Sequence, residues 1–255
     1  VIAERVGVLG AMAPHVLGWA NRMVAMDMDG VNRETEDDAN RASVEFIDEL
    51  RSVIAERRRQ PREDLLTHML TADPNDGQKL TEDEVISTTI LLLNAGHEAT
   101  VHTTGNGVAA ILQSGLDPKA LFAGEEQTAA TVEECLRYDA PLQLFERWVL
   151  DPGVEIAGVA LPVGARVAML LGSANRDPRR FPDPDRFDVA RGDASHVAFG
   201  GGMHFCIGAP LARLEIETTL TLLAGALPRL AFAEPPLRRG GFQFRGYRRL
   251  VLTDT

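Results

Sequence analysis

The stretch that decides the fold lies toward the carboxyl end of the chain, where residues 199–213 read FGGGMHFCIGAPLAR. Glycine lets a backbone adopt positive φ angles and approach a bound group closely, and Pro210 suits the first turn of a helix. Cys206 therefore lies just ahead of a predicted helix N-terminus. Backbone N–H groups and the helix dipole favour a thiolate there, which is the form that ligates metals or attacks electrophiles.

Several roles are open to Cys206 on these residues alone. A buried, inert cysteine is the usual case, although three consecutive glycines and a polar His204 are unusual neighbours for one. A nucleophile with His204 as its base is weaker, because residues two apart on a loop need not face each other. A phosphate-binding loop lacks the Gly-Lys-Ser/Thr ending. The remaining interpretation is a thiolate bound axially to haem iron, with glycines making room for the flat macrocycle.

Composition excludes several other classes of protein. The 255 residues carry 26 Lys plus Arg against 37 Asp plus Glu, a net charge of −11 that argues against binding nucleic acid phosphates. Cys135 and Cys206 are too few for a disulfide framework and lack the paired spacing of a zinc site. We expect Cys135 to be a small core residue. No run of about 18 apolar residues predicts a membrane span.

Hydrophobic periodicity predicts one mostly helical domain over residues 1–255, with a minor sheet. Arg57, Arg58 and Arg59 are expected in the solvated last turn of a long surface helix. The other expected elements are short helices in 1–29, helices over 33–59, 63–71, 128–139 and 210–227, a turn at 73–77, extended pieces at 147–150, 154–156 and 166–171, an irregular loop at 175–188, and two strands in the tail.

A further long helix is predicted from Thr81 to about Gln113, and Thr81 with Glu84 forms a capping box at its start. The helix is apolar around much of its circumference, yet residues 95–100 read AGHEAT. A glycine costs about 1 kcal/mol in a helix relative to alanine, and an inward-facing glutamate costs more unless it is paired. Such a break inside a buried helix indicates function.

The glycine-rich segment resembles the haem-binding loop of the cytochrome P450 family, the haem-thiolate monooxygenases, over the full F-G-x-G-x-H-x-C-x-G spacing. Glu134 and Arg137 resemble the family's Glu-x-x-Arg helix, in which acid and base brace each other and a proline-rich loop. On spacing alone, a Glu and an Arg three apart are most often a surface pair. The resemblance implies the mainly α cytochrome P450 fold, a helical haem-thiolate fold with a small β-sheet.

The same resemblance implies haem b as the cofactor, with the thiolate of Cys206 as the axial metal ligand. His204 and Arg147 match the residues that donate to the haem propionates, a role for which charge-assisted hydrogen bonds are suited. The other implied cofactor-binding residues are Phe199, Gly200, Gly208, Ala95 and Gly96.

The long helix resembles the family's distal helix, on which Ala95 and Gly96 would leave room for dioxygen. Glu98 matches the acid that relays protons, which is its implied catalytic role. The next position usually carries a threonine, and here it is Ala99. Thr100 is the other catalytic candidate, but one residue along a helix rotates a side chain by about 100° and advances it by about 1.5 Å. We therefore expect proton delivery to rely on Glu98 with ordered water or a substrate hydroxyl.

The activity implied by the resemblance is insertion of one oxygen atom of O2 into a hydrophobic small molecule in a bacterial cytoplasm. Electrons would come from NAD(P)H through a ferredoxin reductase and a ferredoxin, with Arg179, Arg180 and Arg213 as candidates for the ferredoxin-docking face. The expected substrate pocket includes Leu91, Asn94, Leu142 and Leu144.

Two other classes remain open: a non-catalytic haem carrier or sensor, and a helical protein without haem in which Cys206 is structural. The resemblance begins in the middle of the family pattern, so that about two-fifths of a usual chain is absent at the N-terminal side. We expect a fragment of a longer protein rather than a truncated paralogue that binds haem poorly. The reason is that the first residues fall inside an apolar helical pattern.

Overall fold

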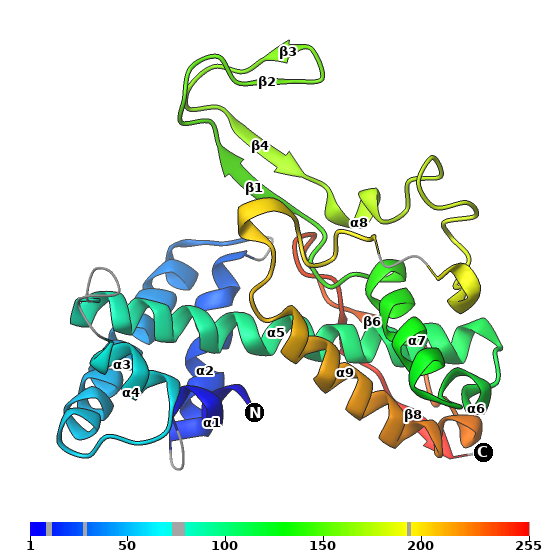
Figure 1. Cartoon of the computed structure of the whole chain (residues 1–255), viewed down its shortest axis with the longest axis horizontal. Coiled ribbons are helices and arrows are strands. Elements are labelled where there is room, and N and C mark those ends of the chain that lie inside the picture. Colours follow the sequence, from blue (N-terminus) through cyan, green and yellow to red (C-terminus); the bar gives the residue numbers. More distant parts are fainter. Residues whose placement is uncertain (9–11, 28–29, 73–79, 193–194, 255) are drawn as a thin grey trace. The chain divides into compact units, whose positions relative to one another are not determined.

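A computed structural model of the chain describes residues 1–8, 12–27, 30–72, 80–192 and 195–254. It contains two compact units, Val1–Glu98 and Ala99–Thr255, which we call unit 1 and unit 2 (Figure 1). The division falls within the long helix α5 (Glu82–Ser114). Each unit has a hydrophobic core of its own. The assignment of the chain to a single domain stays a prediction.

Unit 1 contains only helices among its described residues. They are α1 (Ile2–Val6), α2 (Ala13–Val24), the 3-10 turn η2 (Ala25–Asp27), α3 (Arg33–Arg59), α4 (Leu65–Thr71) and the first part of α5. Pro14 lies in the first turn of α2, where its missing N–H costs no hydrogen bond. The predicted bounds of α3 are confirmed, and the turn predicted at 73–77 lies outside the described residues.

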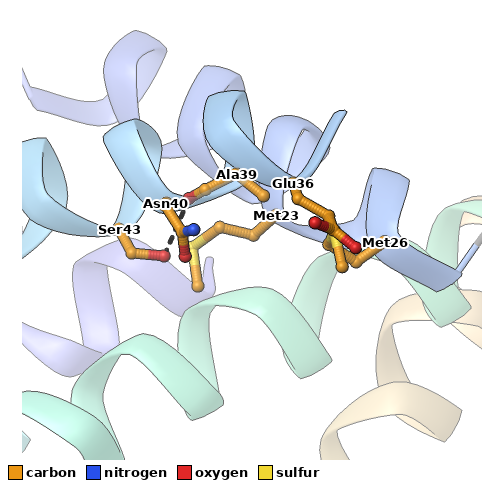
Figure 2. Close-up of a pocket in the computed structure, with 6 residues that line it drawn as sticks. All are labelled: Met23, Met26, Glu36, Ala39, Asn40 and Ser43. Atoms are coloured by element: carbon orange, nitrogen blue, oxygen red, sulfur yellow. Dashed lines mark hydrogen bonds between the residues drawn. The ribbon is translucent and has the colours of Figure 1, made fainter. Parts of the chain in front are cut away.

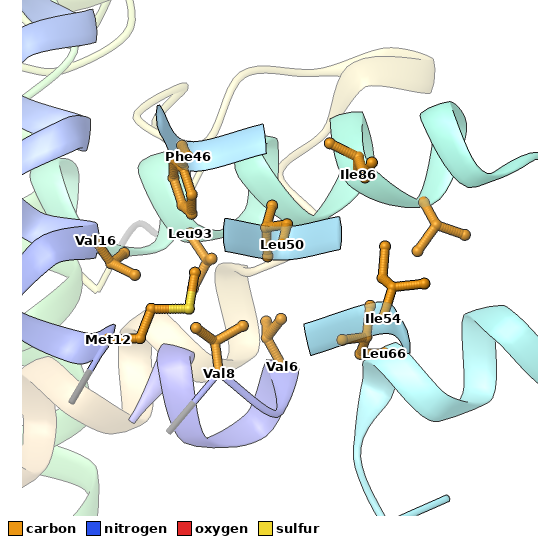
Figure 3. Close-up of a cluster of buried hydrophobic side chains, with 11 residues drawn as sticks. Val6, Val8, Met12, Val16, Phe46, Leu50, Ile54, Leu66, Ile86 and Leu93 are labelled. Atoms are coloured by element: carbon orange, nitrogen blue, oxygen red, sulfur yellow. The ribbon is translucent and has the colours of Figure 1, made fainter. Parts of the chain in front are cut away.

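The core of unit 1 is built on one face of α3, where Phe46, Leu50 and Ile54 recur every fourth residue and are at most 1% exposed. Figure 3 shows these side chains meeting residues of α1, α2, α4 and α5. The labelled partners are Val6, Val8, Met12, Val16, Leu66, Ile86 and Leu93.

Arg57 continues this buried face and contradicts the expectation of a solvated last turn. Its side chain is 3% exposed, its Nε donates to Asp64 Oδ2 at 2.6 Å and its Nη2 donates to the Gly7 carbonyl at 2.6 Å. Asp64 also caps α4, because its Oδ1 accepts from the Thr67 amide at 2.8 Å. The prediction was wrong for Arg57 because it lies three residues after Ile54, on the core side of the helix. Arg58 is exposed, as expected.

Helix α5 begins as the sequence predicts. The Thr81 amide donates to the Glu84 carboxylate at 2.7 Å, and the Glu84 amide donates to the Thr81 hydroxyl at 3.3 Å. This is the reciprocal capping box. The helix then runs unbroken to Ser114, which confirms the predicted long helix, so residues 95–100 interrupt only its apolar pattern.

Unit 2 combines the rest of α5 with further helices and short antiparallel strand pairs. The helices are α6 (Pro118–Leu121), α7 (Glu125–Tyr138), α8 (Leu171–Ala174) and α9 (Ala209–Ala224), with 3-10 turns η4 (Val189–Arg191), η5 (Gly202–His204) and η6 (Leu227–Arg229). The strands are β1 (Phe145–Trp148), β2 (Glu155–Ile156), β3 (Val159–Ala160), β4 (Arg166–Met169), β5 (Leu230–Phe232), β6 (Leu237–Arg238), β7 (Tyr247–Arg249) and β8 (Leu252–Asp254).

The strands pair as β1–β4, β2–β3, β5–β8 and β6–β7, all antiparallel. In the first pair Arg147 lies opposite Val167. The extended pieces predicted before residue 172 correspond to β1, β2 and β4. The tail after α9 holds β5 to β8, four short strands where the sequence predicted two, because each run is too short to give a clear alternation.

The core of unit 2 lies between α5, α7 and α9. Ile111, Leu136, Ile216 and Leu220 are at most 2% exposed and belong to one cluster. Cys135 is 1% exposed within the same cluster, which confirms that it is a core residue. This packing fixes α7 and α9. Helix α9 directly follows residues 199–208, which contain Cys206 and which we call the cysteine loop.

Candidate functional site

Cys206 lies between η5 and the start of α9 in unit 2, so it precedes a helix as the sequence predicts. The turn uses Gly200 at φ 72° and Gly202 at φ 64°, in the left-handed region that favours glycine. The Cys206 amide donates to the Phe199 carbonyl at 3.0 Å, and the Ala209 amide donates to the Cys206 carbonyl at 3.2 Å. These bonds close the loop and join it to the first residue of α9.

The loop turns apolar side chains toward solvent. Met203 is 92% and Ile207 89% exposed, and Phe205 is also exposed, whereas Cys206 is partly buried. Such a row of exposed apolar side chains is typical of a site that meets a ligand or a partner. His204, the second predicted propionate donor, is exposed as well.

The two cysteines differ in the property that a metal ligand needs, which is access to its thiolate. Burial raises the pKa of the Cys135 thiol, and the charge of Glu134 raises it further. Cys206 is partly accessible, and a Cβ added at Gly208 would stand 3.8 Å from its Sγ, so glycine leaves that side of the sulfur open. The residues present therefore fit an axial thiolate ligand at Cys206.

Arg137 forms a buried pair with Glu134, and its side chain is 0% exposed. Its Nε and Nη2 donate to the two carboxylate oxygens at 2.7 and 2.8 Å. The remaining N–H groups donate to three loop carbonyls, those of Asn175, Pro184 and Arg186. All five guanidinium donors are thus satisfied. The interpretation as a surface pair is wrong, and the pair braces the proline-rich loop.

Glu133, the neighbouring acid on α7, forms a second ion cluster that the sequence analysis missed. Arg213 Nε and Nη2 donate to Glu133 Oε1 and Oε2 at 2.6 and 3.0 Å, and His196 Nε2 lies 3.1 Å from Oε2. Burial raises the pKa of Glu133, but the hydrogen bonds and charges of His196 and Arg213 outweigh it and lower the pKa to about 2. Arg213, expected on a docking face, is thus held by Glu133.

Arg147 lies in β1 with its guanidinium 4.4 Å from the centre of the Phe145 ring. Its Nη1 donates to the Glu146 carbonyl at 2.8 Å. Among the residues that the structure describes, no carboxylate forms an ion pair with Arg147, so its other N–H groups can donate to an external carboxylate. Leu142 and Leu144, just before β1, are half-buried, and Leu142 pairs with Phe244 in an isolated bridge.

The residues predicted on the distal helix belong to α5. Glu98 is 8% exposed, so this acid is buried, and its role in proton transfer stays a prediction. Gly96 is explained locally by packing, because an added Cβ would lie 2.7 Å from Cγ1 of Ile2. Thr100 is half-buried and belongs to unit 2, where its carbonyl accepts from the Thr104 hydroxyl at 3.0 Å.

The predicted site residues Leu91, Asn94 and Ala95 of unit 1 differ in exposure. Leu91 is 65% exposed and Ala95 is exposed, so neither lines an enclosed cavity within that unit. Asn94 is half-buried, with its Nδ2 3.9 Å from the sulfur of Met23 and its Oδ1 buried without a partner among the described residues. A buried acceptor of this kind is unusual.

A cavity of about 360 Å³ lies elsewhere in unit 1 (Figure 2). Its lining residues are Met23, Met26, Glu36, Ala39, Asn40 and Ser43, from α2, η2 and α3. The side chains of Met23 and Met26 line this space, which suits their adaptability. The lining includes none of the predicted substrate-pocket residues. In the part of the chain described here, no helix has the length and apolarity that crossing a bilayer requires.

Comparisons with known proteins agree with this geometry. The family model described as cytochrome P450 matches residues 126–224, which include α7 and the cysteine loop. Cytochrome P450 107B1 of Saccharopolyspora erythraea is 40% identical over 236 residues, which is 92% of this chain and 56% of that protein. The chain thus spans little more than half the length of this relative.

Solved structures are also similar over the whole chain. That of P450BioI in complex with hexadec-9Z-enoic acid ligated acyl carrier protein has a TM-score of 0.92 at 35% identity, covering 100% of this chain and 65% of that one. The ligand-free structure of cytochrome P450 TbtJ1 has a TM-score of 0.89 at 34% identity, covering 100% of this chain and 67% of that one. The predicted fold class is confirmed.

Proposed function

The chain belongs to the cytochrome P450 family, and from this premise we propose that it is the haem-binding part of a bacterial monooxygenase. The proposed substrate is a hydrophobic small molecule, and the proposed electron source is NAD(P)H through a ferredoxin reductase and a ferredoxin in the cytoplasm. The observation that carries the proposal is the partly accessible thiol of Cys206 in a glycine turn ahead of α9.

Cys206 is the proposed thiolate ligand, because it lies just ahead of the first turn of α9. Haem b held by this thiolate would supply the activation of O2 for transfer of one oxygen atom to the substrate. His204 and Arg147 are proposed to donate to the two propionates. Phe199, Gly200 and Gly208 shape the proximal side of the cofactor site.

Glu98 is the proposed proton carrier. Its carboxylate is 8% exposed on an unbroken helix, so it can exchange protons with a site of low water content. Ala99, the residue after Glu98, has no hydroxyl. The side chain of Thr100 is rotated about 100° around the helix from the position of Ala99. We therefore propose that ordered water or a substrate hydroxyl completes the relay. Ala95 and Gly96 are proposed to leave room for O2 on the distal side, and Leu91, Asn94, Leu142 and Leu144 are the proposed contacts for the substrate.

The proposal is tested with the two cysteines as a matched pair in the full-length protein. Wild type and Cys135→Ala are expected to bind haem and to give the red-shifted band of a sulfur-ligated ferrous carbonyl complex. Cys206→Ala is expected to lose that band. An unchanged band in Cys206→Ala, or no such band in wild type, would overturn the assignment.

The proton relay is tested by Ala99→Thr and Glu98→Gln, with the fraction of consumed O2 that appears in product as the readout. Glu98→Gln is expected to lower this fraction and Ala99→Thr to raise it. If neither change moves it, the proposed relay is wrong. Ligand-binding difference spectra with steroids, fatty acids, terpenoids and macrolides then identify the substrate class.

A further inference from the structure

We propose that Glu133 is a positioning residue that holds the Cys206 loop at both of its ends, through His196 before the loop and Arg213 after it. The proposal rests on the proposed function, because the loop carries the proposed haem ligand. Glu133 itself is argued to touch neither the cofactor nor the substrate.

The bond to Arg213 fixes the end of the loop that leads into α9. Nε and Nη2 of Arg213 reach different oxygens of the Glu133 carboxylate, at 2.6 and 3.0 Å. A planar fork that grips both oxygens is directional as well as strong. Because Glu133 lies on α7 and Arg213 on α9, this pair ties the helix after the loop to the helix beneath it.

The bond to His196 fixes the segment that enters the loop. The His196 side chain is 1% exposed, its Nε2 lies 3.1 Å from Glu133 Oε2, and its Nδ1 accepts from the Ala198 amide at 3.2 Å. Since Nδ1 accepts that bond, the proton of a neutral ring belongs on Nε2, facing the carboxylate. Glu133 therefore orients the ring that holds the backbone of residues 196–198.

The two arms meet at Phe199, the first residue of the loop. The Arg213 guanidinium stacks 4.7 Å from the centre of the Phe199 ring, and the Phe199 carbonyl accepts the Cys206 amide at 3.0 Å. An arginine held flat over an aromatic ring restrains that ring. The Glu133 carboxylate is thus connected to the Cys206 backbone in three steps. It binds Arg213, Arg213 contacts the Phe199 ring, and the Phe199 carbonyl accepts the Cys206 amide.

Glu134 cannot take over this task, because its carboxylate is already committed. It binds Arg137 and accepts from the Asp188 amide at 2.7 Å, so it serves the proline-rich loop. The two adjacent acids of α7 therefore hold two different segments. The Glu-x-x-Arg spacing identifies Glu134, and no pattern in the sequence predicts the role of Glu133.

The test compares Glu133→Gln with Glu126→Gln in the haem-loaded, full-length protein. Glu126 lies in the exposed first turn of the same helix, so it is the matched control. Glu133→Gln is expected to speed amide hydrogen exchange of residues 199–209 by about tenfold, as expected for loss of a charge-assisted pair that restrains a loop. It is also expected to speed the loss of the red-shifted ferrous carbonyl band by several fold.

Arg213→Gln, alone and combined with Glu133→Gln, tests whether Glu133 acts through Arg213. The double variant is expected to exchange more slowly than the product of the two single effects predicts, because both changes break the Glu133–Arg213 link and only the His196 bond is lost in addition. Full additivity in the double variant would overturn the proposed route. Arg213→Lys keeps the charge but not the fork, and is expected to lie between wild type and Arg213→Gln.

Three outcomes overturn the proposal. In the first, exchange of residues 199–209 is unchanged in Glu133→Gln. In the second, exchange rises equally over the whole of unit 2, which would indicate a merely structural role. In the third, Glu126→Gln has the same effect. Absence of the sulfur-ligated band in wild type would instead refute the proposed function, while the exchange data would still judge the link from Glu133 to the loop.

Discussion

Each unit of this chain contains one buried arginine among its described residues, and the two arginines differ in what they bind. Arg57 in unit 1 binds Asp64 and the Gly7 carbonyl, joining α3 to two short helices. Arg137 in unit 2 binds Glu134 and three carbonyls of a long loop that has no helix or strand of its own over residues 175–188.

The difference shows how a buried charge can substitute for a hydrophobic core. Unit 1 already packs its helices through apolar faces, so Arg57 adds to a core that exists without it. The loop around residues 175–188 has many prolines and cannot form a ladder of backbone bonds, so its carbonyls depend on Arg137. Arg137 is therefore expected to matter more than Arg57.

The largest expected effect is that of Arg137→Met. The change removes the arginine that is hydrogen-bonded to buried Glu134 and the donor of the Asn175 and Pro184 carbonyls, and we expect a loss of about 3–5 kcal/mol in the free energy of unfolding. Urea denaturation measures it. Glu134→Leu added to Arg137→Met is expected to recover part of the loss, because it removes the buried charge of Glu134. A loss below about 1 kcal/mol would contradict the argument.

Arg57→Met is expected to cost about 2–3 kcal/mol. Asp64 keeps its bond to the Thr67 amide, so less is left unsatisfied than around Arg137. Hydrogen exchange is expected to rise in α1 and α4, which Arg57 joins, and not in the loop at 175–188. If Arg57→Met costs more than Arg137→Met, the comparison between the two units is reversed.

The dependence of stability on pH tests the half-buried cluster that Glu133 forms with His196 and Arg213. Its folded pKa of about 2 lies below its ordinary value of 4.5, so the unfolded chain binds more protons between them. The stabilisation is complete above about pH 5 and is lost as the pH falls from about 4.5 toward 2. After allowance for solvent screening, we expect the ionised Glu133 to contribute about 1–2 kcal/mol to the free energy of unfolding. Unfolding of Glu133→Gln as a function of pH is expected to lack this part of the slope, with His196 and Arg213 unchanged.

The smallest expected effect comes from an exposed cap. Asn32 caps α3 by accepting from the Thr35 amide at 3.0 Å, and Asn32→Ala is expected to cost about 1 kcal/mol. Asp64→Ala removes a cap of the same kind together with the partner of Arg57. The additional loss in the free energy of unfolding for Asp64→Ala, compared with Asn32→Ala, therefore measures the buried Arg57–Asp64 pair. Equal losses for the two variants would show that the pair contributes nothing.

The sequence by itself predicted features that depend on neighbours within a turn or two. These include the bounds of α3, the capping box at Thr81, the core position of Cys135 and the place of Cys206 ahead of a helix. Resemblance to a family added the pairing of Glu134 with Arg137. Periodicity, caps and glycine turns are local, so they can be read from a single chain.

Only the tertiary structure decided which charged residues are buried and with what. Arg57 and Arg213 both looked like surface arginines, yet Arg57 is buried in the last turn of α3 and Arg213 is held by Glu133, 80 residues away along the chain. The two-strand expectation for the tail failed for a related reason, and the pocket role of Leu91 stays a prediction. Ion pairs between distant segments, strand pairing and exposure depend on how whole elements pack, and no local pattern of residues determines that packing.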